Sequence, residues 1–96
     1  MKTSILSMSQ INEQLSNLSD WNLEDGGKSI SKVFEFEIFK QALDFTNKVA
    51  EIAETEEHHP NINIYDYNKV CITLSTHSVN GLTEKDFKIA SLIDKL

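Results

Sequence analysis

The sequence predicts an α+β fold, a single domain over residues 1–96 in which helices pack on one face of a four-stranded antiparallel sheet. Apolar residues alternate between helical and strand periods in the order α-β-β-α-β-β-α. Two pairs of short extended segments are separated by one long helical segment, which favours two hairpins in one sheet. A chain of 96 residues also has room for only one hydrophobic core.

The first two elements are a helix and a short strand. Residues 9–18 carry Ile11 and Leu15 at helical spacing, and Ser9 is the candidate N-cap. Residues 21–24 are then expected to be extended. This helix is the first of three that we expect to cover the sheet.

A tight turn follows the first strand. Residues 25–27 read Asp-Gly-Gly, and such residues adopt the positive φ angles that hairpin turns need. The second strand is expected at residues 30–36, with Ile30 and Phe34 on one face. Lys32 interrupts that apolar face. The segment as a whole predicts a β-hairpin.

The longest helical pattern runs from Ile38 to about Glu57. A broad apolar stripe lies along one side of this helix and consists of Phe39, Ala42, Leu43, Phe45, Val49, Ala50, Ile52 and Ala53. Pro60 is the only proline, and proline disfavours helix at the preceding residue. We therefore expect the helix to end by about His58 or His59.

The second half of the chain predicts another strand pair and a last helix. An extended segment begins near Ile62, and residues 70–74 alternate as a half-buried strand does. Thr83 is the expected N-cap of the last helix. Asp86 follows it three residues later and completes a capping box in which aspartate replaces the usual glutamate.

Composition excludes several classes of function. The net charge is -6 and the lysines are scattered, whereas nucleic-acid binding needs a basic patch. The single cysteine, Cys71, excludes an internal disulfide and a four-cysteine metal site, and it suits a cytoplasmic protein. The N-terminal residues do not form the apolar stretch of a signal peptide, and no segment predicts a membrane span.

The candidate functional site is built on the three histidines of the chain. His58 and His59 stand side by side at the end of the long helix, with Glu54 close by, and His77 follows the last strand. We expect all three histidines to converge on one pocket. Adjacent histidines before a proline also decorate solvated helix ends, and that alternative stays open on the residues alone.

A zinc site made from these histidines and a glutamate is a further alternative. Neighbouring residues rarely aim both side chains at one ion, and the usual spacings of metal ligands are absent. We therefore expect no metal at this site.

Four segments together resemble the pterin-4a-carbinolamine dehydratase family. They read Glu-Thr-Glu-Glu-His-His-Pro at 54–60, Tyr-Asn-Lys-Val at 67–70, Leu-Ser-Thr-His at 74–77 and Gly-Leu-Thr-Glu-Lys-Asp at 81–86. The chain departs from the family pattern after Pro60, where a tryptophan found in many members is missing and the segment is one residue longer.

The resemblance implies a hydro-lyase that works without a metal or organic cofactor. Its reaction would convert 4a-hydroxytetrahydropterin (4a-hydroxytetrahydrobiopterin) to quinonoid dihydropterin and water, in tetrahydropterin recycling. Imidazole suits such an elimination because its ordinary pKa, about 6.5, lies near neutral pH. By resemblance, His58 and His77 are the acid/base pair, and His59 holds the pterin.

The resemblance also implies supporting residues. Glu54 matches a carboxylate that supports the site, and at four residues before His58 it is expected to hydrogen-bond that ring if the helix persists. Asp86 matches an acid of the family's last motif, although its capping position alone explains it. Ser75 and Thr76 are expected to offer polar contacts to the pterin.

The expected partners are a small pterin and further copies of the chain, because the family forms homodimers and homotetramers. Neither nucleic acid nor a membrane is expected. A non-catalytic alternative stays open, in which the chain binds a pterin without converting it or binds a protein as a dimerisation cofactor does.

Overall fold

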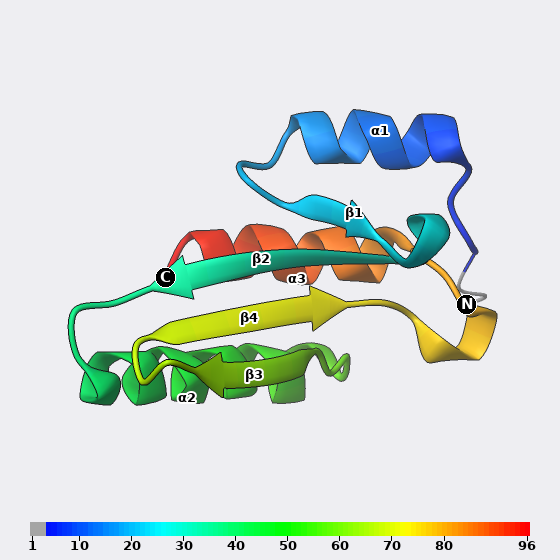
Figure 1. Ribbon diagram of the computed structural model, residues 1–96. Coiled ribbons are helices and arrows are strands. Elements are labelled where there is room, and N and C mark those ends of the chain that lie inside the picture. Colours follow the sequence, from blue (N-terminus) through cyan, green and yellow to red (C-terminus); the bar gives the residue numbers. More distant parts are fainter. Residues whose placement is uncertain (1–3) are drawn as a thin grey trace.

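In the computed structural model, the chain forms one four-stranded antiparallel sheet whose strands lie in the order β1-β2-β4-β3 (Figure 1). The elements are α1 (Met8–Ser16), β1 (Asn22–Glu24), η1 (Asp25–Gly27), β2 (Ser29–Glu35), α2 (Phe39–Glu56), β3 (Asn61–Tyr65), β4 (Lys69–Leu74), η2 (His77–Val79) and α3 (Glu84–Asp94). Their order confirms the predicted α-β-β-α-β-β-α arrangement and the α+β class. The structure describes residues 4–96, so the first three residues of the predicted 1–96 domain lie outside it.

The sheet has one covered and one open face. Val70, Ile72 and Leu74 of β4 are fully buried in one core cluster with residues of α2 and α3. These two helices lie behind the sheet in Figure 1. The β4 residues between the three buried ones point to the opposite face, where Cys71 pairs with Val33 of β2. Val33 is 49% exposed, so no helix of residues 4–96 covers that face at β2. The alternation of β4 follows the predicted pattern.

Helix α1 begins at Met8, and its N-cap is Ser7 rather than the predicted Ser9. The Ser7 hydroxyl accepts a hydrogen bond from the backbone N–H of Gln10 at 3.2 Å, and the Gln10 side chain accepts one from the Ser7 N–H at 2.8 Å. This reciprocal capping box needs Gln or Glu three residues after the cap. Ser9 is followed at that distance by Asn12, which explains why Ser7 and not Ser9 is the N-cap.

The predicted apolar stripe of α2 is too broad. Its buried residues are Ala42, Phe45, Val49 and Ala53, which recur at three- and four-residue spacing. Phe39 is 49% exposed and Leu43 is 39% exposed. Only the side of α2 that meets the sheet and α3 is covered, so the flanking apolar residues stay in contact with solvent.

Lys32 lies within the covered face of β2 because Asp94 of α3 neutralises it there. The Lys32 ammonium lies 2.9 Å from the Asp94 carboxylate and 4.9 Å from the centre of the Phe34 ring. The other Asp94 oxygen accepts a hydrogen bond from the indole N–H of Trp21 at 3.0 Å. This cluster fastens the last turn of α3 to the sheet.

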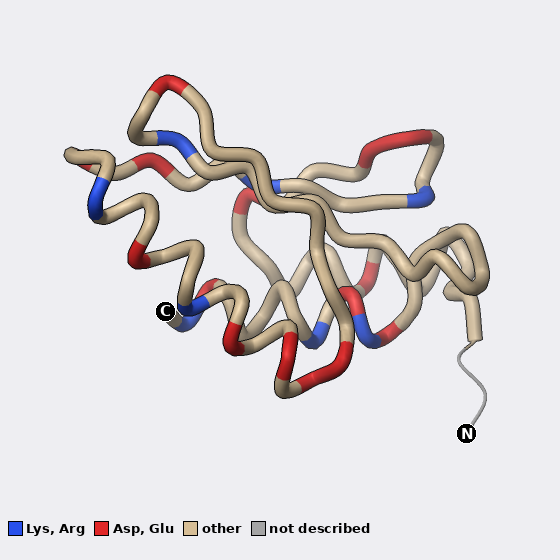
Figure 2. Tube along the Cα trace, turned by 90° about the horizontal axis from the view of Figure 1, so that it is seen from below, with Lys and Arg blue, Asp and Glu red and all other residues tan. Residues whose placement is uncertain are grey.

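No helix in residues 4–96 is long and apolar enough to cross a membrane. Lysines are scattered along the chain trace among acidic residues (Figure 2), and they form no continuous basic stretch in the part of the chain that the structure describes.

Candidate functional site

The site begins where α2 ends. Glu57 follows the helix in the left-handed conformation, with φ 53° and ψ 41°. The N–H of Glu57 donates to the Glu54 carbonyl at 3.4 Å, and the N–H of His58 donates to the Ala53 carbonyl at 3.1 Å. These two bonds form a Schellman motif, which closes the helix and turns the chain away from its axis. His58 therefore lies outside the helical register.

His58 turns toward α3. Its Nε2 lies 2.6 Å from Oδ1 of Asp86, and the two side chains are 11% and 0% exposed. The predicted contact between His58 and Glu54 is wrong, because that contact required the helix to continue for another turn. The left-handed Glu57 ends the helix and gives the ring a partner on a different element.

His59 takes the carboxylate that was expected for its neighbour. Its Nε2 lies 2.5 Å from Oε2 of Glu54, and the two side chains are 64% and 75% exposed. The two adjacent histidines thus point to different carboxylates, one inside the protein and one at its surface. Because the two rings point in different directions, they are not placed to bind the same metal ion.

Asp86 is the centre of a buried hydrogen-bond network. Its Oδ2 accepts from the Thr76 hydroxyl at 2.8 Å and from the backbone N–H of Thr83 at 3.0 Å. The hydroxyl oxygens of Thr76 and Thr83 lie 2.8 Å apart. The predicted capping box of α3 is confirmed. The same aspartate therefore caps a helix and holds a histidine.

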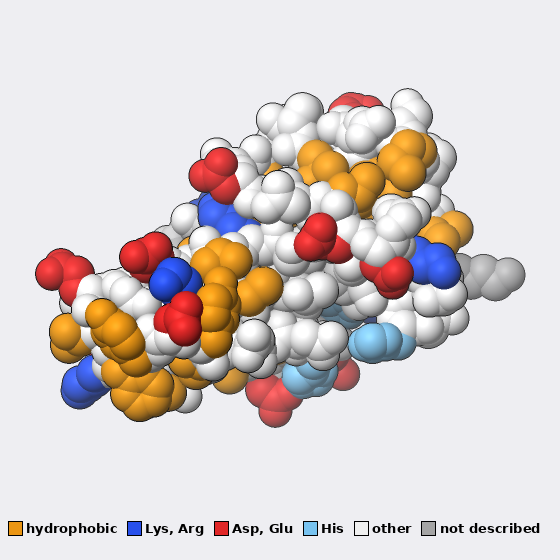
Figure 3. All heavy atoms as spheres, viewed as in Figure 1, with side chains coloured by type: hydrophobic (Ala, Val, Ile, Leu, Met, Phe, Trp, Pro, Cys, Tyr) orange, Lys and Arg blue, Asp and Glu red, His pale blue; other side chains and the backbone are white. Residues whose placement is uncertain are grey.

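The network also reaches the segment that carries His77. Thr76 is 6% exposed and forms a bridge with Gly81, so the chain folds back on itself around η2. His77 is the next residue and is exposed, and Ser75 before it is half-buried. Histidine side chains gather along one margin of the face shown in Figure 3. That all three rings share one pocket stays a prediction.

The role of Thr83 beyond its cap was missed at the sequence level. Thr83 and Thr76 are seven residues apart, and their hydroxyls meet only because the Thr76–Gly81 bridge folds the loop. No local spacing predicts that contact. The buried hydroxyl of Thr76 is engaged inside the protein, where the sequence suggested a contact to a ligand.

The arrangement provides groups for proton transfer. His58 is held by a buried carboxylate, His59 by an exposed one, and His77 lies one residue from the buried network. Imidazoles positioned in this way act as general acids and bases. Among residues 4–96, no cluster of three or more His, Cys, Asp or Glu side chains is arranged to hold a metal ion.

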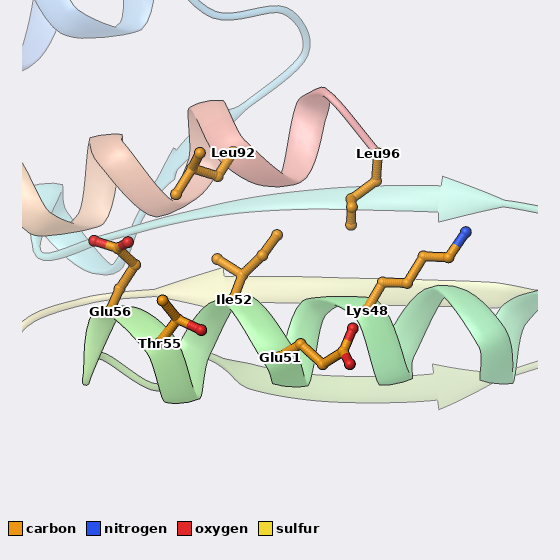
Figure 4. A pocket seen from close by; sticks show the side chains of 7 residues that line it. All are labelled: Lys48, Glu51, Ile52, Thr55, Glu56, Leu92 and Leu96. Atoms are coloured by element: carbon orange, nitrogen blue, oxygen red, sulfur yellow. The ribbon is translucent and has the colours of Figure 1, made fainter.

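A groove of about 570 Å³ lies elsewhere, between α2 and α3 (Figure 4). Ile52, Leu92 and Leu96 point toward one another across it, and charged side chains of α2 form its rim. The groove contains none of the histidines. It is therefore distinct from the candidate site.

Comparison with known proteins identifies relatives. The family model described as pterin 4 alpha carbinolamine dehydratase matches residues 4–96. A protein of Cyanothece sp., provisionally named pterin-4-alpha-carbinolamine dehydratase, is 48% identical over 92 residues, which cover 96% of this chain and 92% of that protein.

Two solved structures share the fold. One, described as a transcriptional coactivator/pterin dehydratase from Brucella melitensis, has a TM-score of 0.90 and 39% identity, and the match covers 96% of this chain and 97% of that one. The other is described as a pterin dehydratase-like RuBisCO assembly factor of the alpha-carboxysome. It has a TM-score of 0.67 and 26% identity, with 79% of this chain and 87% of that one covered.

Proposed function

Since this chain belongs to the pterin 4 alpha carbinolamine dehydratase family, we propose that it is a hydro-lyase that dehydrates 4a-hydroxytetrahydropterin. The products are quinonoid dihydropterin and water. The reaction takes place in tetrahydropterin recycling, and the acting unit is one dehydratase-like domain over residues 1–96.

The elimination needs two proton transfers. One proton goes to the departing hydroxyl group so that the carbon–oxygen bond breaks and water leaves. Another is removed from a ring nitrogen of the pterin, and its bonding pair completes the new double bond. We assign these two transfers to His58 and His77 and the binding of the pterin to His59. The protein's own side chains supply both steps.

The buried pair of Asp86 and His58 is the observation that carries the proposal. A histidine that only decorated a solvated helix end would have no need of a fully buried carboxylate 2.6 Å away. Burial of a charge is expensive unless it is paired and hydrogen-bonded. A precisely held imidazole is what a proton-transfer step requires.

The test is a dehydration assay with purified protein. We expect accelerated loss of 4a-hydroxytetrahydropterin, followed by the absorbance of the quinonoid product. A variant that carries both His58→Ala and His77→Ala should lose most of the acceleration. Unchanged turnover in that double variant would refute the assignment. Full activity after exhaustive chelation is expected as well, and loss of activity there would indicate a metal.

A non-catalytic role is the second candidate. The relative with 26% identity is described as an assembly factor for another protein, and the Brucella relative as a transcriptional coactivator as well as a dehydratase. The exposed Phe39 and Leu43 of α2 offer apolar surface for a protein contact. Co-purification of a partner protein, together with absence of dehydratase turnover, would favour this role over catalysis.

We further propose that the chain forms homodimers or homotetramers in the cytoplasm. The exposed apolar residues of α2 and the open face of the sheet support self-association. Sedimentation of the purified protein tests this point, and a strictly monomeric species would contradict it.

A further inference from the structure

The hydroxyl groups near Asp86 form a chain of hydrogen bonds in which each proton points toward the Asp86 carboxylate. The Thr76 hydroxyl carries a single proton, which it donates to Oδ2 of Asp86 at 2.8 Å. The Thr83 hydroxyl oxygen accepts from the backbone N–H of Lys85 at 3.3 Å and lies 2.8 Å from the Thr76 oxygen. Because the Thr76 proton is already used, the Thr83 hydroxyl donates to Thr76.

Asp86 consequently receives donors from several sides. Oδ2 accepts from Thr76 and from the backbone N–H of Thr83, and Oδ1 faces Nε2 of His58. When Asp86 is ionised it can only accept hydrogen bonds, and its contact with His58 then requires a proton on Nε2. Among residues 4–96, no buried side-chain nitrogen or oxygen lacks a hydrogen-bond partner, so the network is complete.

The two nitrogens of the His58 ring then have different tasks. In the neutral ring one nitrogen carries the proton and the other accepts. In the cation both nitrogens carry protons, and Nε2 still donates to Asp86. Only Nδ1 gains and loses a proton between these states.

We propose that Thr76, Thr83 and Asp86 lock His58 in the Nε2–H tautomer, which leaves Nδ1 as the atom that exchanges a proton with the pterin. Thr76 and Thr83 are positioning residues, because they act on the ring through Asp86. The assignment of the exchange to the pterin rests on the proposed dehydratase function. The tautomer itself does not depend on it.

The direct test is the ¹⁵N magnetic resonance spectrum of protein labelled in its histidine rings. At about pH 8 the ordinary imidazole is mostly neutral, and a protonated ring nitrogen resonates far from an unprotonated one. The spectrum of His58→Gln identifies the His58 signals by their disappearance. We expect a protonated Nε2 and an unprotonated Nδ1 in the unmodified protein. The reverse pattern, or an equal mixture, would overturn the proposal.

Substitutions at Thr76 test the positioning role. Thr76→Val removes the hydroxyl that holds Oδ2 of Asp86, so the carboxylate can turn its Oδ1 away from His58. We therefore expect a mixed tautomer signal and a decrease in kcat of about tenfold with little change in KM. Thr76→Ser keeps the hydroxyl and should restore both the signal and kcat. The matched control is Thr73→Val, the same change on the open face of β4, which should alter kcat by about twofold or less.

The outcomes separate this inference from the proposed function. An Nε2–H ring in a protein without dehydratase turnover would refute the function and support the locked tautomer. An active enzyme in which Thr76→Val leaves both the tautomer and kcat unchanged would refute the network and support the function. If Thr76→Val fails to fold, the spectrum of the unmodified protein still decides the tautomer.

Discussion

Two histidine–carboxylate pairs lie one residue apart and differ in almost everything except distance. His58 meets Asp86 at 2.6 Å and His59 meets Glu54 at 2.5 Å. The first pair is 11% and 0% exposed, and the second is 64% and 75% exposed. Distance alone would rank them as equals.

The two pairs differ because the role of each histidine depends on how firmly its carboxylate partner is held by other groups. Asp86 is fixed by Thr76 and Thr83, so the ring that it holds is fixed as well. Glu54 stands on the exposed side of α2, where water competes for both groups. The buried pair can therefore define a geometry, and the exposed pair can adapt to a ligand.

The largest effect on stability is expected when the buried carboxylate is removed. Asp86→Ala leaves His58, Thr76 and the N–H of Thr83 without their acceptor, so the free energy of unfolding should fall by about 3–5 kcal/mol. Urea denaturation followed by circular dichroism measures the change. Glu54→Ala is the control in the exposed pair. Equal losses in the two variants would refute the contrast.

The two histidines should differ in kinetic effect. His58→Ala should lower kcat on the order of a hundredfold, because a positioned acid/base group is lost. His59→Ala should act mainly through KM, because it removes a group assigned to binding. Steady-state dehydration kinetics separate the two parameters. A larger loss of kcat in His59→Ala would reverse the assignment of roles.

A smaller effect is expected from the cap that supports the buried pair. Thr83→Ala removes the hydroxyl that caps α3 and donates to Thr76, so the free energy of unfolding should fall by about 1–2 kcal/mol. Thr83→Ser keeps the hydroxyl and should behave nearly as the unmodified protein. The experiment is again a urea titration, and an equal loss in the serine variant would point to packing of the methyl group.

The smallest effect belongs to the exposed pair. Glu54→Gln should change the free energy of unfolding by about 1 kcal/mol or less, since exposed ion pairs contribute little. The residual difference should shrink further in about 1 M salt, where charges are screened within a few ångströms. Thermal unfolding at low and high salt checks both points. A large, salt-independent loss would mean that Glu54 has a buried role.

The periodicity of apolar residues was enough to predict the elements and their order. Val70, Ile72 and Leu74 alternate because one face of β4 is buried, and that pattern is local to the strand. The capping box of α3 was also predictable from the sequence, because Thr83 and Asp86 are three residues apart. The Ser7–Gln10 box has the same three-residue spacing, so the sequence contains the signal for the cap of α1, and the prediction of Ser9 is wrong.

The partners of the histidines were not predictable in the same way. Their assignment depends on the left-handed Glu57, and a non-glycine residue in that conformation leaves no local signal. The sequence predicts Asp86 as a site residue, but its histidine partner lies 28 residues away in the chain. Local spacing predicts Glu54 as the partner of His58, but in the folded protein His58 contacts Asp86 and Glu54 contacts His59.

The cluster at Asp94 has a practical consequence. Trp21 is the only tryptophan of the chain, it is 7% exposed, and its indole donates to a carboxylate in the last turn of α3. If that helix leaves the sheet, the indole loses this acceptor and meets water. The fluorescence of one native side chain therefore reports on the docking of the helix that carries Asp86, with no label attached.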